Sequence, residues 1–511
     1  MDWLKLPRPE TNTPPSFTDA LNARIWLADQ PPAQPIPSLK ALTREIVALD
    51  GALLEPNNLL AALGVMQSAA TPLYAAVETR FLRKPLPMAE GEWQAFEAAR
   101  NIWWKLALAY FRCAQRMPGN EQALPLLRSA NALRIVKYCH FQAAVEVPEA
   151  IDELLFGLLG QGQLAGVLTQ TVNDNEFPQT GESKLSGHLA WIFLLTLIAP
   201  YSLSAVQLGV ANRSLSRWRE LCEFRAKPSS DPRGHSLDLA PLFTEPNYPP
   251  GVPRWLELSK VSYKMAGRIK ALREGHSPES LKLGRELSAA ACLRLFNHIE
   301  NALDMPMAEG HDEQGNIELS FGCSHAYLHL KGEELKKPER FNATSSQISH
   351  QRISIFGFDN IAEVTDKPQI PKPPAETWTA LDGYVQRTLA QGGEKRTSPS
   401  LVSARINNKP RLGILRGLRQ NPQGTISGDL DWCGDRVEPG YIASKPGAAD
   451  TTRTPVFLVR QGDSLSLIAP ADAQIRLNES IFPTDLSLGR IAIDAIIERG
   501  VDFTHYNVKN R

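Results

Sequence analysis

The spacing of the hydrophobic residues changes once along this chain, near residue 304, and this change constrains the fold more than any other feature. From about Ser38 to Leu303, apolar residues recur every three or four positions, as in helices that bury one face. From Asn316 onward, short apolar runs alternate with polar residues and are separated by turns, as in strands. The sequence therefore predicts an α+β multidomain protein, with an all-α N-terminal region and a β-rich C-terminal region.

The helical region is expected to consist of stacked helical hairpins. One predicted helix carries apolar residues on a single face, namely Trp93, Phe96, Trp103, Ala107, Tyr110 and Ala114. Further helices are predicted over 151–164, 188–198 and 205–224, with Ser202 or Ser204 as the N-cap of the last. A last helical region is predicted from Trp255 to Leu303. No fixed repeat period is present, so a regular solenoid is not predicted.

Composition divides the chain into five segments, and its length alone predicts two or three domains. The segments are an extended proline-rich N-terminus (1–40), a helical domain (41–305) with a long loop at 226–254, a strand-rich segment packing beside the barrel (306–365), a proline-rich linker (366–376) and a small β-barrel domain (377–511). Strands are predicted at 316–330, 352–358, 401–406, 412–418, 425–430, 455–459, 465–468 and 473–477, the first of which could also be a short helix.

The stretch Pro410–Trp432 predicts a β-hairpin in this barrel. Apolar and polar residues alternate on both sides of the tetrapeptide Asn421-Pro422-Gln423-Gly424. Asn before Pro favours the start of a turn, and Gly at its fourth position accepts backbone angles that other residues avoid. We therefore expect the chain to reverse at 421–424 and to return as a second strand from Thr425.

Arginines gather on or beside these strands, at Arg405, Arg411, Arg416 and Arg419. A guanidinium group pairs through two hydrogen bonds with a phosphate or with the edge of a guanine, so the cluster suits an anionic nucleotide. The alternative is a solvated edge strand, in which charge prevents aggregation. The sequence leaves both interpretations open.

Two other groups of polar residues contain side chains that metal ions use as ligands. Cys323, His325, Tyr327 and His329 would share one face if they lay on a strand, but structural zinc normally needs two spaced pairs of ligands. Asp429, Asp431 and Asp435 have the hard oxygen ligands that Mg²⁺ prefers, but also suit an ordinary turn. Neither a metal nor a catalytic residue is predicted, and the chain has no P-loop or other common catalytic motif.

Bulk properties exclude several classes of function. The chain has no net charge, so no general attraction to DNA, RNA or anionic lipid is expected. Six cysteines without a C-x-x-C pair fit reduced thiols, and the first residues lack the pattern of a secretory signal. The longest apolar run, at 189–199, is too short to span a bilayer. We therefore expect a cytoplasmic protein without a transmembrane segment.

The C-terminal part resembles a group of bacterial multidomain proteins that carry a divergent PilZ-like domain. The resemblance rests on NIELSFGCSHAYLHL (316–330), WTALDGYVQR (378–387), LGILRGLRQNPQG (412–424) and the stretch Ile481–Val508. PilZ domains are small β-barrels that bind cyclic di-GMP through two motifs, R-x-x-x-R before the barrel and D/N-x-S-x-x-G on an early strand. Residues 300–400 contain no R-x-x-x-R, and only Asp382 matches the second motif, so both motifs are degenerate here.

The resemblance implies a bacterial signalling effector without enzymatic activity. Its barrel would bind cyclic di-GMP, with no other cofactor, and its helical domain would relay the signal to a protein partner that controls motility, pili or biofilm. One alternative is an interaction scaffold whose barrel no longer binds nucleotide. A second is a metal-dependent phosphoesterase acting through Asp429 and Asp431. The partner and the oligomeric state do not follow from the sequence.

Overall fold

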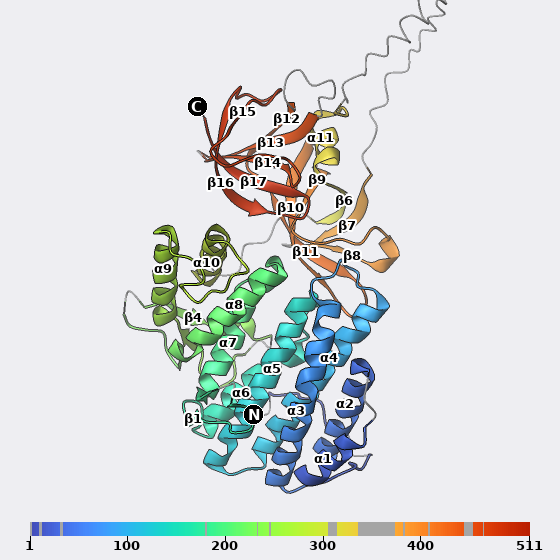
Figure 1. Cartoon of the computed structure of the whole chain (residues 1–511), viewed down its shortest axis with the longest axis vertical. Coiled ribbons are helices and arrows are strands. Elements are labelled where there is room, and N and C mark those ends of the chain that lie inside the picture. The colour runs from blue at the N-terminus through green and yellow to red at the C-terminus, as the bar shows by residue number, and fades with distance from the viewer. Residues whose placement is uncertain are drawn as a thin grey trace, which may run out of the picture. The chain divides into compact units, whose positions relative to one another are not determined.

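The computed structural model describes residues 3–9, 13–30, 34–178, 181–231, 234–244, 247–304, 314–335, 374–381, 384–406, 409–443, 453–462 and 464–510. The chain forms two compact units: Met1–Ala308 with Arg419–Gln423, and Glu309–Leu418 with Gly424–Arg511. Helices predominate in the first unit and strands in the second (Figure 1). The predicted fold class, a helical region followed by a β-rich region with a barrel, is confirmed.

Most of the first unit is helical. Its helices are α1 (Ala20–Ala28), α2 (Pro35–Gly51), α3 (Pro56–Phe81), α4 (Glu90–Gln115), α5 (Ala123–Ala143), α6 (Glu149–Leu164), α7 (Leu185–Leu197), α8 (Ala205–Trp218), α9 (Ser259–Arg273) and α10 (Ala289–Asp304). Ser204 caps α8, because its hydroxyl accepts a hydrogen bond from the N–H of Gln207, whereas Ser202 lies in a preceding 3₁₀ turn. The expected N-cap is thus Ser204.

Helix α4 lies at the centre of this unit. The sequence predicted one apolar face, but from Ile102 to Ala114 the helix is buried around most of its circumference. The reason is that α2, α3 and α5 all pack against it. Trp103 and Tyr110 are among the largest fully buried side chains of the described residues. Small residues between them, such as Ala107 and Ala109, let the neighbouring helices approach closely.

The segment 1–40 differs from the expected extended chain, since α1 occupies Ala20–Ala28 and α2 begins at Pro35. Proline suits the first turn of a helix, because the N–H that it lacks would have no partner inside the helix. Asp19 caps α1 by accepting a hydrogen bond from the N–H of Asn22, at 2.9 Å. One of the prolines on which the expectation of an extended chain rested, Pro35, therefore starts a helix instead.

Helix α3 is long and apolar enough to cross a membrane, as judged by its length and composition. The core helix of a soluble protein can pass the same test. In the described structure, α3 packs against α1, α2 and α4.

Short strands and single 3₁₀ turns complete this unit, and some of them lie in the loop 226–254 that was expected to be irregular. The strands are β1 (Thr171–Val172), β2 (Ser183–Lys184), β3 (Glu223–Arg225), β4 (Ser236–Asp238) and β5 (Trp255–Glu257). The 3₁₀ turns are η1 (Gly119–Gln122), η3 (Pro200–Ser202), η4 (Arg219–Leu221) and η5 (Ala240–Leu242). β1 pairs with β2, and β5 lies between β3 and β4 in an antiparallel sheet.

The second unit contains a closed barrel with the strand order β10-β11-β8-β7-β6-β9. The strands are β6 (Gly315–Phe321), β7 (Glu376–Leu381), β8 (Tyr384–Arg387), β9 (Ser400–Ile406), β10 (Lys409–Gln420) and β11 (Ile426–Trp432), and the turn η6 (Leu389–Gln391) follows β8. β6 pairs with both β7 and β9. The barrel therefore takes one strand from before the proline-rich segment 366–376, where we expected only a neighbour of the barrel.

A second sheet follows the barrel, with the order β12-β13-β14-β17-β16-β15. Its strands are β12 (Arg436–Ala443), β13 (Arg453–Gln461), β14 (Ser464–Pro470), β15 (Ser480–Ile481), β16 (Ile491–Arg499) and β17 (Phe503–Asn510). Backbone hydrogen bonds between Tyr441 and Thr484, at 2.8 and 3.1 Å, bring its two edges together around an apolar core. The strand predicted at 473–477 is absent: residues 473–476 have no regular structure, and a turn follows at 477–478.

Helix α11 (Cys323–Lys331) joins the barrel to the second sheet. It packs on β6 and β9 of the barrel and on β12 and β13 of the sheet. The shared core contains Cys323, Ala326, Tyr327, Leu401, Leu412, Ile414, Phe457, Val459, Ile468 and Phe503. The predicted strand 316–330 is thus a strand followed by a helix. The predicted strand 352–358 and residues 366–373 of the linker lie outside the described residues.

Candidate functional site

The predicted hairpin is present and reverses where the sequence indicated. β10 and β11 are neighbours in the barrel, and the turn between them contains Asn421 to Gly424. The Asn421 side chain accepts a hydrogen bond from the N–H of Gln423 at 3.0 Å. Gly424 has a φ of +78°, and a side chain there would also strike Leu389. Glycine is therefore required at this position.

Arg405 and Arg411 lie on opposite faces of the β9–β10 pair. Arg405 is opposite Pro410, whereas Arg411 is opposite Ala404, and side chains of successive residues alternate between faces. The row of Leu412 and Ile414 packs in the core that contains α11. The row of Arg411, Gly413 and Leu415 therefore faces the barrel interior, and Arg405 lies on the outer side.

Arg411 lies at the end of the interior row, beside an aromatic ring. Its guanidinium carbon is 5.9 Å from the centroid of the Trp432 ring. A Cβ atom built on Gly413 would lie 2.8 Å from this ring, so the glycine leaves room for the indole. Arg411 is exposed and Trp432 is half-buried. A cation and a π-surface thus lie together, and such a pair can bind the phosphate and the base of a nucleotide.

Arg416 is held by two carboxylates instead. Its Nε lies 2.6 Å from Asp431 Oδ2, and its Nη1 pairs with Glu498 of β16. Burial alone would lower the pKa of Arg416, but hydrogen bonds and charge from Glu498 and Asp431 raise it. The side chain is 26% exposed. Arg416 thus joins the barrel to the second sheet, as a structural ion pair would.

We expect Arg416→Ala to lower the free energy of unfolding of the second unit by about 1–2 kcal/mol, because Glu498 loses its charged partner while partly buried. The measurement is hydrogen exchange of the full chain, with peptides from β10 and β16 read separately. Arg405→Ala is the control, since this exposed side chain contacts no carboxylate in the described structure. Equal exchange in both variants would show that the ion pair contributes little.

Arg419 belongs to the first unit, together with the other residues of the hairpin turn up to Gln423. Its Nε is 3.8 Å from Glu146 Oε1, and its guanidinium lies 5.9 Å from the Tyr201 ring centroid. Gln420 forms backbone hydrogen bonds with Ala144 and Glu146, both at 2.9 Å. Arg419 and Arg416 therefore contact different carboxylates.

The structure thus does not gather the four arginines into one cluster. Arg411 faces the barrel interior, Arg405 lies on the outer side, and Arg416 and Arg419 each contact carboxylates. Asp382, the residue carried over from the resemblance, lies outside the described residues. The assignment of these five residues to ligand binding stays a prediction, and the geometry favours Arg411 among the arginines.

The two groups with metal-ligand side chains do not form metal sites among the described residues. Cys323, His325, Tyr327 and His329 lie on α11, where alternate residues point in different directions. His325 Nδ1 bonds the carbonyl of Phe321, and His329 Nδ1 bonds the Ser403 hydroxyl. Among the described residues, no group of three or more His, Cys, Asp and Glu side chains could hold a metal ion.

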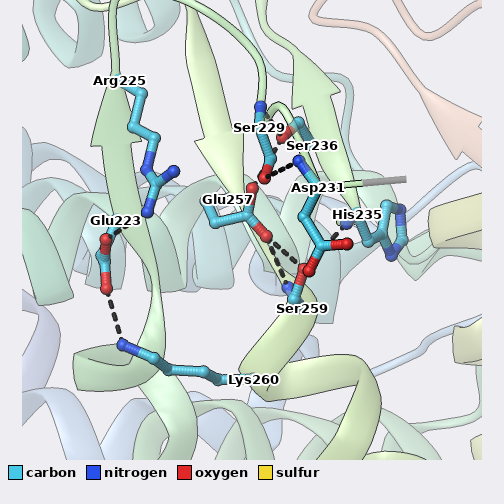
Figure 2. Close-up of polar contacts among 9 residues, drawn as sticks. All are labelled: Glu223, Arg225, Ser229, Asp231, His235, Ser236, Glu257, Ser259 and Lys260. Carbon is cyan, nitrogen blue, oxygen red and sulfur yellow. Dashed lines mark hydrogen bonds and ion pairs between the residues drawn. The ribbon is translucent and has the colours of Figure 1, made fainter. Parts of the chain in front are cut away.

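A further polar cluster, which sequence reasoning missed, surrounds Glu257 of β5 (Figure 2). The Glu257 carboxylate accepts hydrogen bonds from the Ser236 hydroxyl at 2.7 Å and from the N–H and hydroxyl of Ser259. Burial alone would raise the pKa of Glu257, but these hydrogen bonds lower it. The Ser229 N–H donates to Ser236 Oγ at 2.9 Å, so the cluster fixes the loop after β3.

The imidazole of His235, beside this cluster, has a partner on each ring nitrogen. Its Nδ1 lies 2.9 Å from Ser262 Oγ, and its Nε2 lies 3.1 Å from the carbonyl oxygen of Leu303. Both ring nitrogens are therefore engaged, and the second one satisfies a carbonyl in the last turn of α10. The sequence feature that could have indicated this cluster is the dense run of serine, aspartate and histidine at 229–238. In the structure, its described polar side chains hold the loop and the neighbouring elements together.

Comparison with known protein families matches part of the helical region. Residues 21–229 match the family model described as the N-terminal domain of the cyclic-di-GMP receptor FimW. Over these residues the chain is similar to the FimW N-terminal domain. The matched region begins within α1 and ends just after β3, so α9, α10 and the whole second unit lie beyond it. No curated protein and no solved structure matches the chain.

Proposed function

We propose that this chain is a cyclic di-GMP receptor that acts as a signalling effector in the bacterial cytoplasm and has no catalytic activity of its own. The observation that carries the proposal is the match of residues 21–229 to the N-terminal domain of a cyclic-di-GMP receptor. The closed barrel of the second unit agrees with the resemblance to PilZ domains. The two regions support the same ligand independently, because they do not overlap in the chain.

In this proposal the barrel binds the nucleotide at the Arg411 end of its interior row. The exposed guanidinium of Arg411 would pair with a phosphate or a guanine edge, and the neighbouring Trp432 ring would stack on a base. Arg416 is less suited, because a ligand phosphate would have to displace Asp431 and Glu498. The helical unit would then relay the bound state to a protein partner that controls motility, pili or biofilm.

Isothermal titration of the full chain with cyclic di-GMP tests the proposal. We expect saturable heat, and Arg411→Ala should weaken the affinity by about tenfold or more, because one charge-assisted hydrogen bond contributes about 1.5–3 kcal/mol. Trp432→Ala should also weaken binding, whereas Arg405→Ala on the outer side should change it little. Higher salt should reduce the affinity.

Flat titrations of the natural chain would refute nucleotide binding and favour the scaffold alternative, in which Arg416 and Arg419 serve only their carboxylate partners. Binding that Arg405→Ala weakens and Arg411→Ala does not would move the site to the outer side of β9. Melting temperatures of all three variants, measured alongside, separate lost contacts from lost folding.

A further inference from the structure

An open groove of about 1040 Å³ lies between three helices of the region that matches the FimW N-terminal domain. The N-terminal half of α2, the last turns of α3 and the first turns of α4 form its walls. The lining residues are Gln34, Pro35, Ile36, Pro37, Lys40, Thr43, Arg44, Ala76, Val77, Arg80, Gln94, Glu97, Ala98 and Asn101. This set, hereafter the α2–α4 groove, is separate from the barrel residues discussed above.

The charge in the α2–α4 groove is predominantly positive. Lys40, Arg44 and Arg80 line it with one carboxylate, that of Glu97. All three cations are exposed, and within the described residues none of them has a hydrogen bond or ion pair. The whole chain has no net charge, so this local excess is not a consequence of composition. The groove therefore offers unneutralised guanidinium and ammonium groups to an anionic partner.

The remaining lining favours a peptide over a nucleotide. None of the described lining residues is aromatic, so no ring is available to stack on a base. Three side-chain amides, from Gln34, Gln94 and Asn101, can both donate to and accept from a peptide backbone. Pro35, Pro37 and Ala76, which are half-buried or exposed, add an apolar surface on which small side chains can pack.

We propose that the α2–α4 groove binds an extended acidic segment of a protein partner. The Arg44 and Arg80 guanidinium groups would pair with its Asp or Glu carboxylates, and the three amides would hold its backbone. This site rests on the proposed function, in which the helical unit relays the signal to a protein partner. It adds where that partner binds and by what chemistry. It places the partner contact within residues 21–229, the region that matches the FimW N-terminal domain.

Fluorescence anisotropy of the full chain tests this site, with a labelled peptide in which Glu alternates with Ala and Pro. The reference peptide has Gln in place of each Glu. We expect saturable binding of the Glu peptide only, and a loss of about tenfold or more in the Arg44→Glu, Arg80→Glu double variant. Arg24→Glu with Lys264→Glu is the matched control, since it makes the same change in net charge at exposed positions outside the groove.

Three results would overturn the acidic-peptide site. They are equal binding of the Gln peptide, an equal loss in the control double variant, or loss of cyclic di-GMP binding in the groove variant with peptide binding unchanged. The last would make the groove a nucleotide site. Failure of the proposed function looks different, because the natural chain would then give no heat with cyclic di-GMP while still binding the Glu peptide. Circular dichroism of each variant checks that the helices are intact.

Discussion

Replacing Glu376 with alanine is expected to lower the free energy of unfolding of the second unit by about 3–5 kcal/mol. The side chain is 11% exposed and lies between two arginines. One of its oxygens pairs with Arg387, itself only 3% exposed, and the other accepts from Arg396 at 2.7 Å and from the Glu394 N–H at 2.8 Å. Removing the carboxylate leaves the buried Arg387 guanidinium with a carbonyl oxygen, that of Glu394, but without its negatively charged partner, which costs more than the pair contributes.

The same contacts predict how stability depends on pH. Burial alone would raise the pKa of Glu376, but Arg396, the Glu394 N–H and Arg387 together lower it. Because the pKa is lower in the folded state than its usual value of 4.5, the carboxylate stabilises the fold above that pH. This contribution is lost as the pH falls through the folded-state pKa. Glu376→Ala should therefore flatten the acid side of the stability profile.

Hydrogen exchange of β7 and β8 amides in the full chain measures the effect, because it reports the opening of that part of the barrel separately. Glu394→Ala is the matched control, since its carboxylate is 81% exposed and lies 3.3 Å from the same Arg396. We expect Glu394→Ala to lower the free energy of unfolding by less than about 0.5 kcal/mol. Similar effects of the two substitutions would show that the buried network contributes no more than a surface ion pair.

Asp174→Ala is expected to lower the free energy of unfolding of the first unit by about 3–5 kcal/mol, as much as Glu376→Ala in the second. Arg128 of α5 donates to both oxygens of Asp174, at 2.8 and 2.7 Å, and each side chain is only 4% exposed. The guanidinium also lies 5.1 Å from the Phe177 ring centroid. Without Asp174, the buried guanidinium of Arg128 would have Glu176 as its remaining carboxylate partner. Glu176 is 44% exposed, so water weakens that ion pair.

Tryptophan fluorescence during urea unfolding of the full chain measures this loss. All tryptophans except Trp378 and Trp432 belong to the first unit, so the signal reports mainly that unit. Glu176→Ala removes the outer carboxylate only, and should cost less than about 1 kcal/mol. A larger loss in Glu176→Ala than in Asp174→Ala would contradict the assignment of Asp174 as the principal partner of Arg128.

Local patterns predicted those parts of the fold in which neighbouring residues decide the structure. The long α4 and the turn at Asn421–Gly424 are examples, because periodicity and turn chemistry act within a few residues. The segment 323–331 was ambiguous, since a short apolar run fits a strand or a helix. There Gly322, with a φ of +87°, ends β6 and allows α11 to begin. Strand β12 was not predicted, because Pro439 and Gly440 are residues that normally interrupt strands. It tolerates the proline because it lies at a sheet edge.

The candidate site was less predictable, because the partners of its arginines are distant in sequence. Glu498 is 82 residues from Arg416, and no local pattern links them. Likewise, nothing near Arg419 indicates that it contacts Glu146. Which of the clustered arginines faces the barrel interior depends on the register of β9 and β10, which the sequence indicates only roughly. Pairing of charges across a fold is a tertiary property.

The position of β6 decides how the second unit can be cut. A recombinant fragment that begins at residue 377 would lack this strand, and the edges of β7 and β9 would lose the pairing partner that separates them from other chains. Such a fragment is a poor choice for crystallisation or binding assays, because unpaired edges promote association. Conversely, a protease that nicks the chain between α11 and β7 would leave two pieces that still complement each other through the β6–β7 ladder.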